Sequence, residues 1–267
     1  MADTHLTNAD GKPLRILLTN DDGIHADGLK ALEKIAHNLS DDVWIVAPET
    51  EHSGASRSLT LSKPLRLREI EERRFSVEGT PADCVLMAVR SILDAPPDLL
   101  LSGVNRGQNI ADDVTYSGTV AGAMEGTALG IPSMALSQSY GFTSQSRADI
   151  VWECAEHHGP ELIRRLWGHD IGEGNLININ FPDCTPDAVT GTEVTTQGKR
   201  DQNLMRIVER VDARERPYYW LGFSREKSNP AEGTDLRAIY ENRISVTPLQ
   251  LNLTQTKALD MLRGALG

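Results

Sequence analysis

Short apolar runs alternate with segments of helical periodicity over the first two thirds of the chain. Residues 16–19 form an apolar run of the kind found in a strand that is covered on both faces. Over residues 26–39 apolar side chains recur three or four positions apart, which predicts a helix, and residues 43–47 form a second strand that ends at Pro48. This strand–helix–strand order is typical of a parallel sheet with right-handed crossovers.

The same periodicities continue along the chain. They predict strands at residues 65–70, 75–77, 98–102, 133–137 and 176–180, and helices from Pro81 to about residue 92, over 117–129 and over 148–167. We expect Thr80 to cap the first of these helices, with Pro81 in its first turn, and Gly130 to end the second.

The last third of the chain changes character and predicts β-hairpin material. The segments expected to form it lie at residues 189–197, 206–211 and 218–223, followed by a strand at 244–247 and a closing helix at 254–262. Three consecutive aromatic residues, Tyr218, Tyr219 and Trp220, fall on one of these strands. They either form a contact between subunits or cover the core, and the sequence leaves both interpretations open.

Together these elements predict an α/β protein with a Rossmann-like, mostly parallel sheet, helices on both faces and a C-terminal β-hairpin extension. Residues 1–13 are polar, and we expect them to be a flexible tail. The 267-residue chain suits one large domain, so residues 14–267 would form it, with the hairpin extension at about 190–240.

Charge and cysteine content limit the possible binding partners and the cellular compartment. A net charge of −11 argues against nucleic acid or an anionic membrane as a partner. No apolar stretch is long enough to span a bilayer, and residues 1–13 lack the apolar segment of a secretory signal. Cys84, Cys154 and Cys184 are widely spaced and odd in number, which fits a reducing compartment. We therefore expect a cytoplasmic protein.

The strand at residues 16–19 leads directly into two adjacent aspartates, Asp21 and Asp22, in the sequence Asn-Asp-Asp-Gly. Open α/β folds bind their ligands at this carboxyl edge of the sheet. Neighbouring carboxylates repel each other, and a hard divalent cation such as Mg²⁺ or Mn²⁺ relieves that repulsion. Asn, Asp and Gly also favour turns, so a purely structural interpretation stands beside the metal site.

Three further polar segments follow a predicted strand or begin a predicted helix. They are residues 53–56 (Ser-Gly-Ala-Ser), 102–109 (Ser-Gly-Val-Asn-Arg-Gly-Gln-Asn) and 116–119 (Tyr-Ser-Gly-Thr). Loops at the carboxyl ends of parallel strands converge, so Ser53 and Asn105 could add neutral oxygen ligands to a cation. The free N–H groups at the helix start near Ser117 suit a phosphate.

A metal ion on carboxylates that faces a phosphate site is the apparatus of phosphoryl hydrolysis. Each segment also has a plain structural interpretation. Ser53 and Gly54 could form a simple turn, Asn105 and Asn109 could occupy left-handed turns, and Ser117 could be only a helix cap. Their coincidence at the same edge of the predicted sheet favours a shared site.

Eight segments in a fixed order resemble the SurE family, the stationary-phase survival proteins that act as nucleoside monophosphate phosphatases. The matching segments are residues 16–25 (Ile-Leu-Leu-Thr-Asn-Asp-Asp-Gly-Ile-His), 46–48 (Val-Ala-Pro), 53–56 with 58–60 (Ser-Leu-Thr), 79–85 (Gly-Thr-Pro-Ala-Asp-Cys-Val), 102–109, 112–121 (Asp-Asp-Val-Thr-Tyr-Ser-Gly-Thr-Val-Ala), 123–126 (Ala-Met-Glu-Gly) and 245–249 (Ser-Val-Thr-Pro-Leu). They cover almost the whole chain.

The resemblance implies a SurE-like α/β domain whose hairpin extension forms a homodimer or homotetramer. It implies one divalent ion, Mg²⁺ or Mn²⁺, per subunit, held at the positions of Asp21, Asp22, Ser53 and Asn105. Substrate and phosphate contacts would come from Asn20, Gly54, Asn109, Ser117, Gly118 and Thr119. The substrates implied are nucleoside 5′- and 3′-monophosphates, and for some members short polyphosphate.

Asp21 and Asp22 are then the candidate catalytic residues, and two mechanisms are open. The metal ion could activate a water molecule, or an aspartate could attack phosphorus directly, with Asp21 the better candidate. In either case the helix start at Ser117 would stabilise charge on the phosphoryl group.

Two other classes of protein share part of this pattern. A phosphorylated signalling receiver also carries paired acids, but it is shorter and needs an acceptor Asp where residues 102–105 read Ser-Gly-Val-Asn. A nucleotide-binding module without catalysis would need Gly-x-Gly-x-x-Gly after the first strand, and this chain has Asn-Asp-Asp-Gly-Ile-His. The chain departs from the family at Asp27, where Pro is usual, and at Asn252, where Asp is frequent; neither is a presumed ligand.

Overall fold

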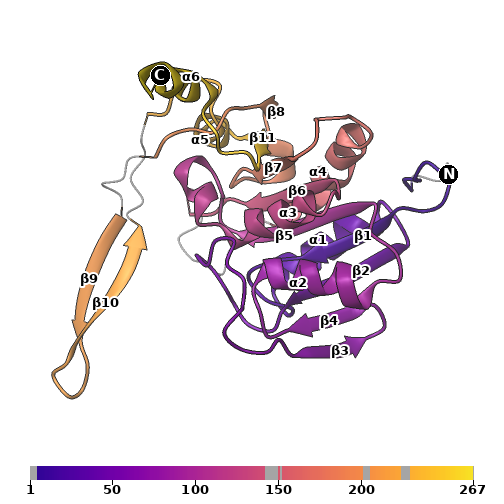
Figure 1. Cartoon of the computed structure of the whole chain (residues 1–267), viewed down its shortest axis with the longest axis horizontal. Coiled ribbons are helices and arrows are strands. Elements are labelled where there is room, and N and C mark those ends of the chain that lie inside the picture. Colours follow the sequence, from indigo (N-terminus) through magenta and orange to yellow (C-terminus); the bar gives the residue numbers. More distant parts are fainter. Residues whose placement is uncertain (1–4, 142–149, 151, 201–204, 224–228, 267) are drawn as a thin grey trace.

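Among the described residues, a nine-stranded sheet carries most of the core, and helices cover both of its faces (Figure 1). The architecture is that of a computed structural model, which describes residues 5–141, 150, 152–200, 205–223 and 229–266. The strands are β1 (Arg15–Thr19), β2 (Asp42–Pro48), β3 (Leu67–Glu71), β4 (Arg74–Val77), β5 (Leu99–Arg106), β6 (Ser133–Gln138), β7 (Asn175–Phe181), β8 (Gly191–Val194), β9 (Met205–Val211), β10 (Pro217–Phe223) and β11 (Arg243–Gln250). The helices are α1 (Asp27–His37), α2 (Pro81–Met87), α3 (Gly118–Ala128), α4 (Trp152–Leu166), α5 (Asp235–Tyr240) and α6 (Thr256–Leu266). A short π-helix at Ala88–Ile92 continues α2, and short 3₁₀ helices lie at Ala111–Thr115 and Pro186–Ala188.

The strand order is β3-β4-β2-β1-β5-β6-β7-β11-β8. Neighbouring strands from β4 to β7 are parallel, and Leu17 of β1 pairs with Trp44 on one side and Leu100 on the other. The chain adds strands in one direction up to β4 and then in the other direction from β5, so the order reverses between β1 and β5. This point is where doubly wound folds bind ligands. The Rossmann-like α/β prediction is confirmed.

Each face of the sheet packs against its own pair of helices. On one face α1 and α4 contribute buried side chains such as Leu29 and Ile163. On the other face α2 and α3 contribute Val85 and Val120. The central strands are therefore covered on both sides, which explains the continuous apolar run in β1.

Helix α2 begins with the cap that the sequence predicts. Thr80 Oγ1 accepts a hydrogen bond from the Asp83 N–H at 3.2 Å, and Asp83 Oδ2 accepts one from the Thr80 N–H at 2.9 Å, with Pro81 in the first turn. Asp83 Oδ1 also accepts from the Thr60 N–H at 3.1 Å. Part of the 79–85 segment thus serves to start this helix and hold a loop against it.

Strand β8 lies at the edge of the main sheet and not in the expected hairpin. Residues 189–197 were predicted as hairpin material, but β8 pairs in parallel with β11 at the edge of the main sheet, and β11 is antiparallel to β7. The prediction was wrong because residue alternation identifies a strand and not its partner. β11 also runs on through Pro248, which is tolerated because β8 pairs no further than Val246.

β9 and β10 form a separate antiparallel hairpin that projects from the body (Figure 1). The predicted hairpin extension is present, and within the described residues its two strands cover 205–211 and 217–223 of the expected region. Tyr219 and Trp220 are 60% and 63% exposed, so they do not cover the core of this chain. Of the two interpretations of the aromatic cluster, this leaves the contact between subunits. α5, which the sequence pattern did not predict, follows the hairpin.

The expected tail is held against the domain over its described part. Leu6 packs against the core, and its N–H donates to the Leu39 carbonyl at 2.8 Å. Residues 1–4 lie outside the described residues, as do residues 148, 149 and 151 of the helix predicted at 148–167. In the described chain, none of the helices has the length and apolar character needed to cross a membrane.

Candidate active site and metal centre

The polar segments expected to converge meet at the carboxyl edge of β1 and β5. The Arg106 N–H donates to Asp22 Oδ2 at 3.0 Å, which joins the loop after β1 to the end of β5. The His52 N–H donates to the Asp21 carbonyl at 2.7 Å, which joins the same loop to the one after β2. The acid pair is therefore fixed from two sides by backbone hydrogen bonds.

The Asp21 side chain is enclosed by the first turn of α3. Thr119 Oγ1 donates a hydrogen bond to Asp21 Oδ1, and a Cβ on Gly118 would lie 2.7 Å from Asp21 Cβ, so position 118 requires glycine. Burial raises the pKa of Asp21 to about 6, the nearby charge of Asp22 adds to the rise, and the Thr119 hydrogen bond opposes it. A carboxylate in this state is stabilised by any cation that reaches it.

Asn20 braces the turn that carries the two acids. Its Nδ2 donates to the Gly23 carbonyl at 2.9 Å, and its Oδ1 accepts from the Gly23 N–H at 3.3 Å. The residue is fully buried. The structure thus gives Asn20 a role in holding the turn, while its contact with phosphate stays a prediction.

Ser53 lies on the exposed loop after β2, and its Oγ donates to Glu51 Oε1 at 2.8 Å. Gly54 follows with a φ of +76°, which favours glycine. Ser56 fastens the far end of this loop, because its Oγ donates to the Thr115 carbonyl at 2.8 Å. The expected metal ligand Ser53 is thus carried on a loop that is tied to the segment before α3.

Glu51 is a third carboxylate near the acid pair, and the sequence did not single it out. Its charge contributes to the raised pKa of Asp21, and its side chain contacts Ser53 directly. A glutamate in a polar loop is ordinary by sequence. Its nearness to Ser53 follows from the sequence, but its hydrogen bond to Ser53 depends on a rotamer that the sequence does not indicate.

Asn105 and Asn109 lie in different surroundings. Asn105 is half-buried at the end of β5, and its Nδ2 donates to the Gly107 carbonyl at 2.8 Å, so its amide oxygen is the atom suited to a cation. Asn109 is buried, and its carbonyl accepts from the side chains of Asn178 and Asn180 at 2.8 and 3.1 Å. The phosphate contact expected of Asn109 stays a prediction.

The first turn of α3 supplies anion-binding groups next to the acid pair. Ser117 is the cap of this 11-residue helix, and its Oγ accepts from the Val120 N–H at 3.0 Å. The N–H groups of a first turn have no acceptor within the helix, and the helix dipole makes them partly positive. Because the Thr119 hydroxyl is bonded to Asp21, Gly118 and Thr119 offer an anion their backbone N–H groups.

The donor atoms at this edge fit a hard divalent cation. Asp21 and Asp22 supply carboxylate oxygens, Ser53 a hydroxyl oxygen and Asn105 an amide oxygen, which are the ligand types of Mg²⁺ and Mn²⁺. Over the described part of the chain, no three His, Cys, Asp or Glu side chains are grouped so that they could hold a metal. A cation here would therefore depend on two aspartates, neutral oxygens and water.

A hollow of about 430 Å³ adjoins the acid pair at Asp22. Its volume is within the range of small-molecule sites, so it has room for the organic part of a phosphoester. It is lined by Asp22, Gly23, His25, Ala26, Glu49, Thr50, Glu51 and Arg106.

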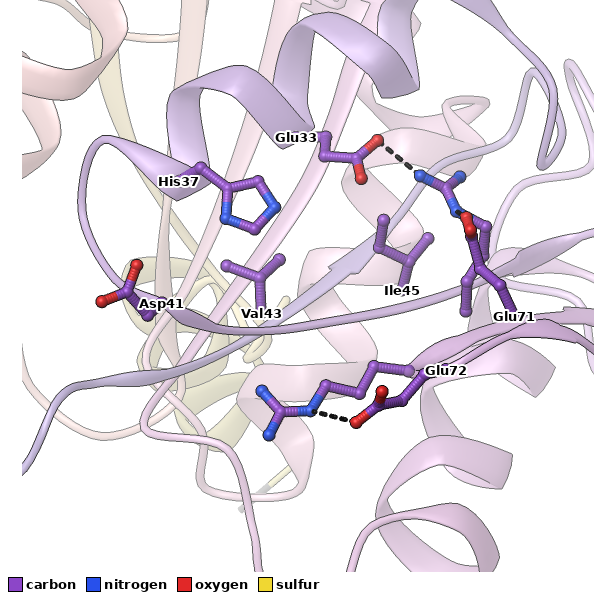
Figure 2. Close-up of a pocket in the computed structure, with 9 residues that line it drawn as sticks. Glu33, His37, Asp41, Val43, Ile45, Glu71 and Glu72 are labelled. Atoms are coloured by element: carbon purple, nitrogen blue, oxygen red, sulfur yellow. Dashed lines mark hydrogen bonds and ion pairs between the residues drawn. The ribbon is translucent and has the colours of Figure 1, made fainter.

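A second hollow of about 380 Å³ lies near the other end of β2, away from the acid pair (Figure 2). Figure 2 shows Val43 and Ile45 between side chains of α1 and of the β3–β4 turn. The charged groups there pair with one another, as Arg74 does with Glu33 of α1 and with Glu71. This hollow contains none of the predicted site residues.

The two positions where the chain departs from the family pattern are both at the surface. Asp27 begins α1, and its Oδ1 accepts from Lys30 Nζ at 2.8 Å, which lowers the pKa of Asp27. Asn252 Oδ1 accepts from the Thr254 N–H at 2.9 Å in a turn before α6. Each side chain thus has a hydrogen-bond partner two or three residues along the chain.

Comparisons with known proteins show which family and fold this chain is similar to. The family model described as survival protein SurE matches residues 16–204. The chain is 63% identical to the 5′-nucleotidase SurE of Parvibaculum lavamentivorans, over 96% of this chain and 92% of the relative, and 60% identical to that of Methylobacterium sp. (strain 4-46), over 95% and 100%. The crystal structure of the SurE protein from Aquifex aeolicus superposes with a TM-score of 0.81 at 38% identity, over 94% of this chain and 99% of the other.

Proposed function

Because this chain belongs to the SurE family, we propose that it is a metal-dependent phosphatase that hydrolyses nucleoside 5′- and 3′-monophosphates to nucleoside and phosphate. The observation that carries the proposal is the acid pair Asp21 and Asp22, of which Asp21 is buried beside the first turn of α3 and Asp22 is half-buried. The names of the relatives support the 5′ activity. The 3′ activity and the further candidate substrate, short polyphosphate, are supported by the family resemblance alone.

The residues present fit one divalent ion per subunit, Mg²⁺ or Mn²⁺. When bound, the ion would neutralise charge on the phosphoryl oxygens and lower the pKa of a water molecule. The backbone N–H groups of Gly118 and Thr119 would hold the phosphoryl oxygens and stabilise the charge that builds on them during transfer. Hydrolysis adds the oxygen of water to phosphorus, breaks the bond from phosphorus to the ester oxygen and leaves a proton on the departing nucleoside. The residues that would hold the ion are Asp21, Asp22, Ser53 and Asn105.

The attacking atom is either the oxygen of water or a carboxylate oxygen of Asp21. The closeness of the Asp21 carboxylate to Gly118, where a Cβ would lie 2.9 Å from Oδ2, supports the second route. Quenching a single turnover in acid distinguishes them. Phosphate covalently bound to Asp21 in the quenched protein supports the covalent route, and its absence while substrate is being consumed supports direct attack by water.

The proposal is tested by phosphate release from a panel of nucleoside 5′- and 3′-monophosphates and tripolyphosphate, with Mn²⁺, Mg²⁺ or EDTA. We expect release from nucleotides that is lost with EDTA and reduced at least about 100-fold in Asp21→Asn, because the variant loses a ligand charge. Asp27→Asn is the matched control, since it removes the same charge from an exposed acid that is paired with Lys30. A folded wild-type protein that binds Mn²⁺ and releases phosphate from none of these compounds would contradict the proposal.

We further propose that the protein assembles as a homodimer or homotetramer through the β9–β10 hairpin and works in the cytoplasm. The apolar side chains exposed on the hairpin support the assembly. The three free cysteines, Cys84, Cys154 and Cys184, support a reducing compartment.

A further inference from the structure

Glu51 stands beside the proposed cation ligands without being one of them in the family pattern. Its Oε1 accepts the hydrogen of Ser53 Oγ at 2.8 Å. It lies on the loop after β2, which the His52 N–H ties to the Asp21 carbonyl at 2.7 Å. The carboxylate is thus fixed next to the one proposed ligand that carries a rotatable hydroxyl.

A serine hydroxyl can coordinate a cation only with a lone pair of its oxygen. The hydroxyl hydrogen must point elsewhere, and a free hydroxyl rotates among several positions. A carboxylate that accepts the hydrogen selects one position and makes the oxygen more electron-rich. Groups that hold metal ligands in this way typically change metal affinity by about 10–100-fold when they are removed.

We infer that Glu51 is a positioning residue, which acts through Ser53 to raise the affinity of this site for a divalent cation. The inference rests on the proposed function, because it requires Ser53 to be a ligand. Glu51 accepts the hydrogen of Ser53 Oγ, so the lone pairs of that oxygen stay available to a cation. The proposed effect comes from the hydrogen bond to Ser53 and not from negative charge alone, which Glu49 of the same loop also carries.

The test is Mn²⁺ binding to the full chain in the absence of substrate, measured by calorimetric titration. Four proteins are compared: the wild type, Glu51→Ala, Ser53→Ala and the double variant. We expect Glu51→Ala to weaken Mn²⁺ binding by about 10–100-fold. In the Ser53→Ala background, the further loss from Glu51→Ala should stay within about threefold, because the two residues act as one unit.

Two control variants separate position from charge. Glu49→Ala removes the same charge from the same exposed loop and leaves the bond between Glu51 and Ser53 in place, so its affinity should stay within about threefold of the wild type. Glu51→Gln keeps an acceptor oxygen for Ser53 and should bind more tightly than Glu51→Ala. Circular dichroism establishes that each variant is folded.

Three results would overturn the inference: Glu51→Ala binding as tightly as the wild type, losses that add in full in the double variant, or an equal loss in Glu49→Ala. If the wild type binds Mn²⁺, Asp21→Asn does not, and Glu51→Ala equals the wild type, the inference fails and the proposed function stands. If the folded wild type binds no Mn²⁺, the metal-dependent function fails together with the inference.

Discussion

Asp21 is buried, lies near a second carboxylate and touches the first turn of a helix. The first two conditions raise the free energy of its charged form, whereas the helix N-terminus and the Thr119 hydroxyl lower it. The net effect is a raised pKa, so in the metal-free protein the charged side chain costs stability. Many functional sites show this trade of stability for binding.

Replacing this side chain should therefore stabilise the metal-free protein. At pH 8 in EDTA we expect the free energy of unfolding of Asp21→Asn to exceed that of the wild type by about 1–3 kcal/mol. Urea unfolding measures this difference. The folded pKa of about 6 lies above the ordinary value of 3.8, so the folded protein holds the proton more tightly than the unfolded chain. The penalty is complete above pH 6 and fades as pH falls toward 4, so the advantage of the variant should shrink over that interval.

Asp27→Asn serves as the comparison for this measurement. Its exposed carboxylate is paired with Lys30, which lowers its pKa, so this variant should gain no stability at pH 8. An Asp21→Asn protein that is no more stable than the wild type at pH 8 would contradict the account of the acid pair.

Among single residues, the sequence predicted the location of those that stand directly after a strand pattern or at the start of a helix pattern. Asp21 and Asp22 directly follow an apolar run, and Ser117 opens a helical pattern, so both could be assigned to the carboxyl edge. The bonds from Thr119 to Asp21 and from Ser53 to Glu51 could not, because they depend on how separate loops meet or on the rotamer of a surface side chain.

Among the helices, α2 depends most clearly on its cap. Asp83 is buried, and its two oxygens accept from the N–H groups of Thr80 and Thr60. Asp83→Ala would leave both donors without an acceptor, so we expect a loss of about 2–4 kcal/mol in the free energy of unfolding. Urea unfolding at pH 7.5 checks this, with Glu72→Ala as the control because that side chain is 91% exposed. A loss below about 0.5 kcal/mol for Asp83→Ala would contradict the role of the cap.

The elements that the sequence assigned correctly are those with a strong local signal. β1, α1 and β2 each have a clear periodicity and a clear end. β8 was predicted as a strand but with the wrong partner, because its partner β11 is separated from it in the sequence by the hairpin. α5 was missed because six residues give too short a pattern to show a helical period.

At the scale of the whole molecule, the β9–β10 hairpin is an isolated two-stranded sheet, a structure that is marginal in water. Ile207 and Leu221 are paired across it and are 70% and 76% exposed. If the hairpin forms the proposed assembly, Leu221→Glu should place a charge in the contact and shift the protein to a smaller species. Size-exclusion chromatography with light scattering measures the mass directly.

Arg214→Glu, in the turn of the same hairpin, is the control and should keep the mass of the wild type. A Leu221→Glu protein of unchanged mass would show that this face of the hairpin lies outside the contact. A wild type that is monomeric at micromolar concentration would contradict the proposed assembly itself.

The place of β11 between β7 and β8 also sets the order in which a growing chain can finish folding. Among the described strands, β8 pairs only with β11, which leaves the ribosome roughly 50 residues later, a delay of a few seconds at about 5–20 residues per second. Until then the outer edge of β7 is also unpaired. A ribosome that stalls within this interval would hold an open sheet edge among neighbouring nascent chains, where it is most exposed to aggregation.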